Sequence, residues 1–306
     1  MNALPLVTDF VRTDESAFAH IPDFPYPPHY TEVGGLRIAC IDEGPRDAPV
    51  VLLMHGEPTW SFLYRKMIPV LLQAGFRVVA PDLVGFGRSD KPIRKGDYSY
   101  RHHVQWMSAW LQANDLTSIT LFCQDWGSLI GLRMAAAAPE RFDRIVLANG
   151  GLPTGTTPVP KAFKIWRAFA QYSPWFPIGR IVKAGCTGWL TPAEVAAYDA
   201  PFPDRGHRAA LRAFPALVPE HPDDDGAAVS REAARFWREQ WQGSSLMVIG
   251  QADPVLGEPV MRQLHQCIRN CPPPVVLPQA GHFVQEHGAP VAQQALSHFQ
   301  FSVPTS

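Results

Sequence analysis

The chain has 306 residues, of which 46% are hydrophobic and 18% charged, and its formal net charge is −1. This composition excludes a disordered or fibrous protein. The 27 basic and 28 acidic residues are nearly balanced and form no basic run, which argues against a nucleic-acid partner. The five cysteines include no C-x-x-C pair, so neither a disulfide framework nor a zinc site is predicted. Small molecules are therefore the expected ligands.

The N-terminal segment gives no sign of export. "MNALPLVTDFVRTDESAF" (residues 1–18) lacks the basic start and the unbroken apolar core of a signal peptide. Elsewhere no apolar run is long enough to span a bilayer. A cytoplasmic location without a membrane partner is therefore expected.

The first predicted element is an antiparallel hairpin, because the strand-like runs of "YTEVGGLRIACID" (residues 30–42) flank a Gly-Gly pair. Apolar, β-branched runs then recur between helix-like segments such as "HHVQWMSAWLQA" (102–113). Strands that are apolar throughout predict a mostly parallel sheet with helices on both faces, and hence an α/β fold. The six runs span residues 50–54, 77–80, 118–122, 144–148, 246–250 and 275–277.

The alternation of strands and helices stops after Ala148 and resumes only at Leu246, a gap too long for one crossover connection. The gap holds the aromatic segment "FKIWRAFAQYSPWFPIGRIV" and a later stretch rich in proline and charge. We therefore expect a helical cap at residues 154–229, inserted into a core formed by residues 1–153 and 230–306. It would cover the C-terminal ends of the strands, where α/β sheets bind ligands.

The segment "LFCQDWGSLIG" (residues 121–131) leads from a predicted strand into a predicted helix. A strand-to-helix turn with a glycine close by is typical of a nucleophile elbow, in which the helix N-terminus lies beneath the reactive side chain. Asp125 occupies that position, so it is the candidate nucleophile. The alternative is an ordinary aspartate N-cap of the helix, which is a common use of this residue.

A nucleophilic carboxylate forms an ester, and a base must then activate water to hydrolyse it. His282 in "QAGHFVQEHG" and Asp253 in "VIGQADPVLG" each follow a predicted strand, on the same rim as Asp125. The order nucleophile, acid, histidine resembles that of the α/β-hydrolases. The other common acid position, after the strand at 144–148, holds Asn149 and no carboxylate, which favours Asp253. A turn-capping aspartate and a surface histidine are the structural alternatives.

The segment "LLMHGEPTW" follows another strand with a His-Gly turn, which commonly supplies one backbone N–H of an oxyanion hole. The second N–H comes from the residue after the nucleophile. The predicted donors are therefore the backbone amides of Glu57 and Trp126. A role for the Glu57 side chain does not follow from the sequence, and an exposed loop acid is the alternative.

An aspartate suits attack on saturated carbon, with an epoxide oxygen or a halide as the leaving group. Trp126 follows the nucleophile directly, and an indole N–H is a donor that never becomes an acceptor or a base. Trp166 in the aromatic cap segment is a second candidate donor. Two indoles would bind a halide ion without the cost of burying an arginine. Ordinary cap packing is the alternative for Trp166, and Trp175 is its strongest rival.

The motifs "HGEPTW", "CQDWG", "FKIW", "GQADPVLG" and "AGHFVQEHG" together resemble those of the haloalkane dehalogenases, in particular the subfamily with two halide-binding tryptophans and an Asp-His-Asp triad. The resemblance covers most of the chain, though the cap more loosely. It implies an α/β-hydrolase fold, no metal and no organic cofactor. It also implies the following roles: Asp125 as nucleophile, His282 as base, Asp253 as the acid orienting it, and Trp126 with Trp166 as halide donors.

A haloalkane substrate, water and a halide ion are the partners that this resemblance implies, and the chain is expected to be a monomer. An epoxide hydrolase is the nearest alternative and would use the cap tyrosines Tyr172 and Tyr198. A non-catalytic receptor with a hydrolase fold is the alternative from another class. The predicted substrate-pocket residues are Phe163, Phe169, Trp175 and Leu256.

Overall fold

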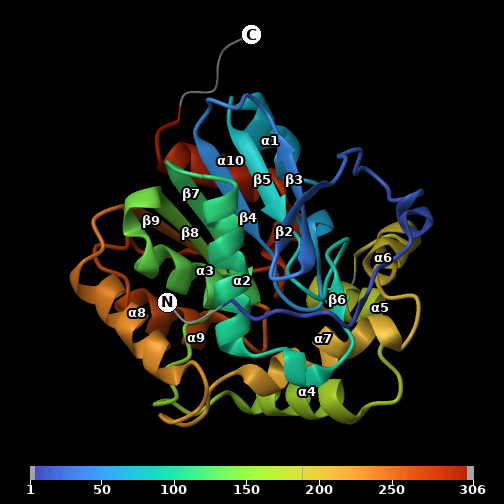
Figure 1. Ribbon diagram of the computed structural model, residues 1–306. Helices are drawn as coiled ribbons and strands as arrows, with labels where there is room; N and C mark the ends of the chain where they lie inside the picture. The colour runs from blue at the N-terminus through green and yellow to red at the C-terminus, as the bar shows by residue number, and fades with distance from the viewer. Residues whose placement is uncertain (1–3, 188, 302–306) are drawn as a thin grey trace.

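The computed structural model describes residues 4–187 and 189–301, so the ends of the predicted core range lie outside the described residues (Figure 1). An eight-stranded sheet has the strand order β10-β9-β8-β7-β4-β5-β3-β2. All strand pairs from β10 to β5 are parallel, whereas β3 pairs antiparallel with both β5 and β2. The predicted mostly parallel α/β sheet is thereby confirmed, as is the antiparallel hairpin at its edge.

The strands of this sheet coincide with the predicted runs; β4, β5, β7, β8 and β9 are largely buried on both faces, whereas the edge strands β2 and β10 are partly exposed. Their bounds are β2 His29–Val33, β3 Leu36–Glu43, β4 Val50–Met54, β5 Arg77–Pro81, β7 Ile119–Asp125, β8 Phe142–Gly150, β9 Ser244–Gly250 and β10 Val275–Leu277. A separate two-stranded sheet pairs β1 (Phe10–Val11) with β6 (Lys91–Pro92).

Helices cover both faces of the sheet. On one face α2 (Tyr100–Ala113) packs on α3 (Trp126–Ala137), which in turn packs on α8 (Ala227–Glu239). On the other face α1 (Ile68–Gln73) contacts α10 (Ala289–His298), which Figure 1 shows behind the strands. The remaining core helices are η1 Glu15–Phe18, η2 Ser61–Tyr64, η3 Lys95–Asp97, η4 Pro139–Arg141, α9 Glu258–Gln266 and η7 Val284–His287.

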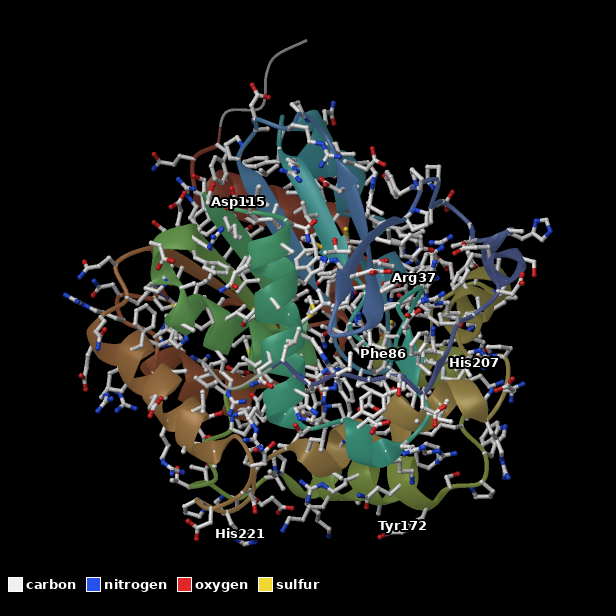
Figure 2. The ribbon with its side chains drawn as sticks, viewed as in Figure 1. Arg37, Phe86, Asp115, Tyr172, His207 and His221 are labelled. Atoms are coloured by element: carbon white, nitrogen blue, oxygen red, sulfur yellow. The ribbon has the colours of Figure 1, made fainter. Side chains whose placement is uncertain are left out.

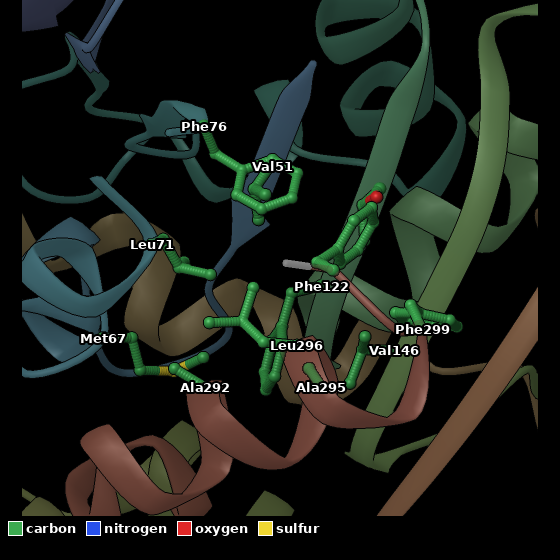
Figure 3. A pocket seen from close by; sticks show the side chains of 12 residues that line it. Val51, Met67, Leu71, Phe76, Phe122, Val146, Ala292, Ala295, Leu296 and Phe299 are labelled. Carbon is green, nitrogen blue, oxygen red and sulfur yellow. The ribbon is translucent and has the colours of Figure 1, made fainter. Parts of the chain in front are cut away.

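The space between α10 and the sheet contains a small apolar cavity (Figure 3). Side chains from three strands and from the helices α1 and α10 line it, among them Phe122 of β7 and Leu296 of α10. None of the candidate site residues lines this cavity, which belongs to the packing of the core.

The segment between β8 and α8 is helical and lies along the bottom and the right side of the view in Figure 1. Its helix α4 buries Ala170 and leaves Ile165 63% exposed, as expected for an amphipathic helix that covers a core. Within the described residues, none of the helices combines the length and hydropathy that a bilayer crossing needs. The helices of this segment are α4 Lys161–Tyr172, α5 Ile178–Gly185, α6 Pro192–Asp199, η5 Gly206–Arg208, α7 Ala209–Ala213 and η6 Phe214–Leu217.

A buried polar network joins this helical segment to the core. The guanidinium of Arg65, directly after η2, donates to both carboxylate oxygens of Glu286 in η7, at 2.6 and 2.8 Å. From α6, Glu194 accepts a further bond from Arg65, and the Tyr198 hydroxyl donates to Glu286. Because Arg65 and Glu286 are almost fully buried, each needs the other as a partner, and the network fixes α6 to the core.

Candidate active site

Asp125 is the last residue of β7 and immediately precedes α3. Its backbone has φ 49° and ψ −127°, a conformation that a residue other than glycine rarely adopts. The side chain makes no capping bond to α3, so the N-cap alternative does not describe its use here. The sharp turn lifts the carboxylate above the strand ends while the N-terminus of α3 lies next to it.

Two glycines make room for this turn. A Cβ on Gly127 would lie 2.0 Å from the carbonyl oxygen of Met54, so only glycine lets α3 approach β4 this closely. A Cβ on Gly56 would lie 2.3 Å from Oδ1 of Asp125. The glycines of "HGEPTW" and "CQDWG" therefore share one function, which is to bring these two segments together.

The two carboxylate oxygens of Asp125 face different partners. Oδ1 accepts a hydrogen bond from the backbone N–H of Glu57 at 2.8 Å. Oδ2 lies 3.6 Å from Nε2 of His282. The carboxylate thus has one oxygen on a backbone donor and the other toward the imidazole.

Asp253 lies in the turn after β9 and is buried. Its Oδ2 is 2.7 Å from Nδ1 of His282 and accepts a bond from the side-chain amide of Asn149 at 2.9 Å. Its Oδ1 accepts the backbone N–H of Val255 at 2.8 Å. The structure therefore places the imidazole of His282 between the carboxylates of Asp125 and Asp253.

Electrostatics link these three groups. Burial raises the pKa of Asp253, but the charge of His282 and the bonds from His282, Asn149 and Val255 outweigh burial and lower it. For His282, burial lowers the pKa, while the charges of Asp253 and Asp125 raise it to about 10. Loss of the negative charge of Asp125 would therefore lower the pKa of His282.

The side chain of Glu57 is buried beside the nucleophile. Burial and the negative charge of Asp125 raise the pKa of Glu57 well above its usual value, and contacts with Trp166 and His282 offset this only in part. Oε1 of this carboxyl is buried without a hydrogen-bond partner among the described residues. The shift favours the neutral form of Glu57, which would remove a negative charge from the site.

The two candidate indoles lie close to the nucleophile in different surroundings. Trp126 is 2% exposed and packs edge-on against Tyr100 and Phe214, with ring centroids 5.2 and 4.6 Å away. Trp166 of α4 is half-buried, and its indole N–H lowers the pKa of Glu57 in part, which indicates that it lies near that carboxyl. Hence Trp126 is held between the core residue Tyr100 and the cap residue Phe214, whereas Trp166 itself belongs to the cap segment.

The predicted pocket residues separate into two groups. Phe169 stacks against Trp166 with ring centroids 5.8 Å apart, and the buried Phe176 packs against both. Phe163 and Leu256 are half-buried. Trp175, also predicted to line the pocket, is 61% exposed, so the structure does not bring it into this aromatic cluster.

Comparison with known proteins bears directly on this site. Residues 49–180 match the model of the alpha/beta hydrolase fold family. A haloalkane dehalogenase of Mycobacterium marinum is 46% identical over 95% of this chain and 100% of its own length. One from Psychrobacter cryohalolentis is 45% identical, over 90% and 93%. This chain belongs to the haloalkane dehalogenases.

A solved relative agrees with this assignment. Haloalkane dehalogenase DpaA from Paraglaciecola agarilytica superposes with a TM-score of 0.93 at 42% identity, over 96% of this chain and all of that one. The predicted family, fold and hydrolytic dehalogenase activity are confirmed. DpaA is described as tetrameric, which is at odds with the monomer predicted from the sequence.

The epoxide-hydrolase alternative is not favoured, by these relatives or by the cap tyrosines of this dehalogenase. Tyr172 is 81% exposed and lies on the outer rim of the molecule in Figure 2. The hydroxyl of Tyr198 is used by Glu286 in the network that fixes α6. Neither hydroxyl is directed at Asp125.

Two residues of this dehalogenase site were not predicted. Asn149 was not selected because it is not a carboxylate. Its side-chain nitrogen donates to Asp253 and to the carbonyl oxygen of Gly250, and its side-chain oxygen accepts the N–H of Gly250. Gln124 precedes the nucleophile, and its amide nitrogen lies 2.9 Å from Nε2 of His282. Both residues lie near the C-terminal ends of strands that reach the site, and this position was the signal available in the sequence.

Proposed function

We propose that this dehalogenase works through an aspartyl ester, with Asp125 as the nucleophile toward a halogenated alkane. One oxygen, Oδ1, accepts the N–H of Glu57, which leaves Oδ2 as the attacking oxygen. Oδ2 forms a bond to the halogen-bearing carbon as the carbon–halogen bond breaks, and the electron pair leaves with the halide. The product of this first step is an alkyl ester of Asp125.

The departing halide is bound by the indole N–H groups of Trp126 and Trp166. A halide is a weakly basic anion, so it needs neutral donors in a dry pocket rather than an acid. Burial beside Asp125 favours the neutral carboxyl of Glu57, which would not repel the anion. Phe163, Phe169 and Leu256 would form the apolar wall that receives the alkyl chain.

In the second step His282 takes a proton from water, and the oxygen of that water attacks the carboxyl carbon of Asp125. The N–H groups of Glu57 and Trp126 stabilise the negative charge on Oδ1 of the tetrahedral intermediate. The ester C–O bond then breaks, the proton passes from His282 to the leaving alkoxide, and an alcohol is released. The carboxyl of Asp125, which keeps the other proton of the water, loses it to solvent and becomes the carboxylate again. Asp253 holds the imidazole in the required tautomer throughout.

The cap consists of residues 154–229 in this proposal and carries Trp166 to the site. The haloalkane substrate is apolar and the products are an alcohol and a halide ion, so water is the only other reactant. The tetramer described for DpaA leads us to propose an oligomer here, which light scattering would test against the monomer. The cytoplasmic location stays a prediction, which cell fractionation would test.

The proposal depends above all on one observation: the Asp125 carboxylate contacts a backbone donor with one oxygen and faces His282 with the other. The experiment is bromide release from 1,2-dibromoethane by the wild type and by Asp125→Asn, with an epoxide and fluoroacetate run in parallel. We expect bromide from the wild type only. Diol from the epoxide without bromide would refute the proposal.

A further inference from the structure

Gln124 is buried in β7, one residue before the nucleophile. Its side-chain nitrogen lies 2.9 Å from Nε2 of His282 and 3.2 Å from the backbone carbonyl oxygen of the same histidine. No step of the proposed reaction uses this side chain. The contact nevertheless involves the nitrogen that must accept a proton from water.

The neighbours of Gln124 determine which end of its amide faces His282. A carbonyl oxygen can only accept a hydrogen bond, so the nitrogen end must be directed at the His282 carbonyl. On the opposite side, Oε1 of Gln124 faces the side-chain nitrogen of the buried Gln285, 3.5 Å away. In the neutral imidazole, whose Nδ1–H donates to Asp253, the side-chain N–H of Gln124 donates to the lone pair of Nε2.

We propose that Gln124 is a positioning residue for ester hydrolysis, which holds the imidazole of His282 unprotonated at Nε2 and aimed at the Asp125 ester until water takes over that lone pair. The inference rests on the proposed role of His282 as base. It assigns to Gln124 an effect on the second step of the reaction, with little effect on the first.

The charges around His282 explain why such a residue is needed. Three carboxyl groups face the imidazole: Asp125 after β7, Asp253 after β9 and Glu57 after β4. The charges of Asp125 and Asp253 favour the imidazolium form, which cannot accept a proton from water. Esterification removes the charge of Asp125, but that of Asp253 remains. A neutral N–H donor at Nε2 opposes the remaining bias.

Two substitutions of Gln124 should affect the protonation of His282 to different extents. An apolar side chain of similar size would remove the donor and let His282 hold a proton at higher pH. A carboxylate of the same size would accept from the imidazolium and stabilise it. Both substitutions test the same contact, and Gln124→Glu should slow ester hydrolysis more than Gln124→Met.

The experiment separates the two steps by rapid quench with 1,2-dibromoethane, following bromide release and decay of the alkyl-enzyme between about pH 6 and 10. In Gln124→Met the acid limb of ester hydrolysis should move up by about one pH unit. In Gln124→Glu hydrolysis should fall by roughly a hundredfold, and the alkyl-enzyme should accumulate. The rate of bromide release in the first turnover should change far less in both variants.

Wild-type pH profiles for hydrolysis in both variants, or an equal loss in both steps at every pH, would overturn the inference and leave Gln124 a packing residue. Gln124→Glu is nearly isosteric, so it keeps the test decidable where Gln124→Met does not fold. Absence of bromide release by the wild type would instead refute the proposed function. The two failures are therefore distinguishable.

Discussion

The core rim and the cap hold their candidate residues in different ways. On the rim, Asp125 is bound by the backbone N–H of Glu57, and Asp253 by that of Val255. In the cap, Trp166 stacks on Phe169 and packs edge-on against Phe176. Backbone donors have fixed positions, whereas an aromatic cluster tolerates a range of packings.

This difference separates two tasks in one site. The rim residues would set the reaction, which needs reacting atoms placed to a fraction of an ångström. The cap residues would set halide binding and substrate shape, which can vary without loss of the chemistry. Changes on the rim should therefore affect rates by orders of magnitude, and changes in the cap should affect binding more modestly.

The largest effect is expected for Asp253→Asn. This change removes the charge that orients His282 and favours the wrong tautomer, so turnover should fall by roughly 10³ to 10⁴-fold. The measurement is steady-state bromide release, with Asp47→Asn on the exposed surface as the control. Turnover within a few-fold of the wild type would mean that Asp253 is not the orienting acid.

A smaller effect is expected in the cap for Trp166→Phe. Loss of one N–H donor to an anion should weaken chloride binding by roughly tenfold to a hundredfold. Trp175→Phe is the matched control, because this second cap indole is 61% exposed. Inhibition of bromide release by chloride gives both affinities. Equal effects of the two substitutions would remove Trp166 from the halide site.

Asn149, at the end of β8, is expected to contribute to the stability of the protein. Asn149→Gly keeps the positive φ of 28° accessible but removes three buried hydrogen bonds, and should cost about 1 to 3 kcal/mol of unfolding free energy. Asn270→Gly is the control, since Asn270 also has positive φ but is exposed. Denaturant unfolding measures both, and matching values would show that the amide network contributes nothing.

The smallest effect at neutral pH is expected for Glu57→Gln. Burial and the charge of Asp125 raise the pKa of Glu57, so we expect a neutral carboxyl there and a change in chloride affinity of less than about threefold. As pH rises through that raised pKa, the wild-type carboxyl ionises and repels the halide, whereas glutamine does not. Chloride inhibition should therefore weaken at alkaline pH in the wild type alone. Parallel pH profiles would contradict a neutral Glu57.

The sequence allowed the sheet and the rim to be predicted because both depend on local patterns. Apolar runs identified the strands, and the positions of Asp125, Asp253 and His282 directly after strands brought them to one edge. A parallel sheet makes this inference possible, since all its strands end on the same side.

The contributions of Asn149 and Gln124 could not be predicted, because they depend on register rather than on pattern. A bulge pairs Asp125 with Gly150 after Gln124 has paired with Ala148, and this leaves Asn149 free to reach Asp253. The sequence already favoured Trp166 over Trp175 as the halide donor, and the position of each relative to α4 agrees with that choice. Trp166 shares the inner face of α4 with Phe169, whereas Trp175 lies beyond the end of the helix.

The central claim is that Asp125 forms an ester which His282 hydrolyses, and the most direct measurement is the intact mass of His282→Gln after mixing with 1,2-dibromoethane. The account predicts one bromide released per enzyme molecule, no further turnover, and a bromoethyl adduct on the peptide that contains Asp125. Sustained turnover without an adduct would contradict it.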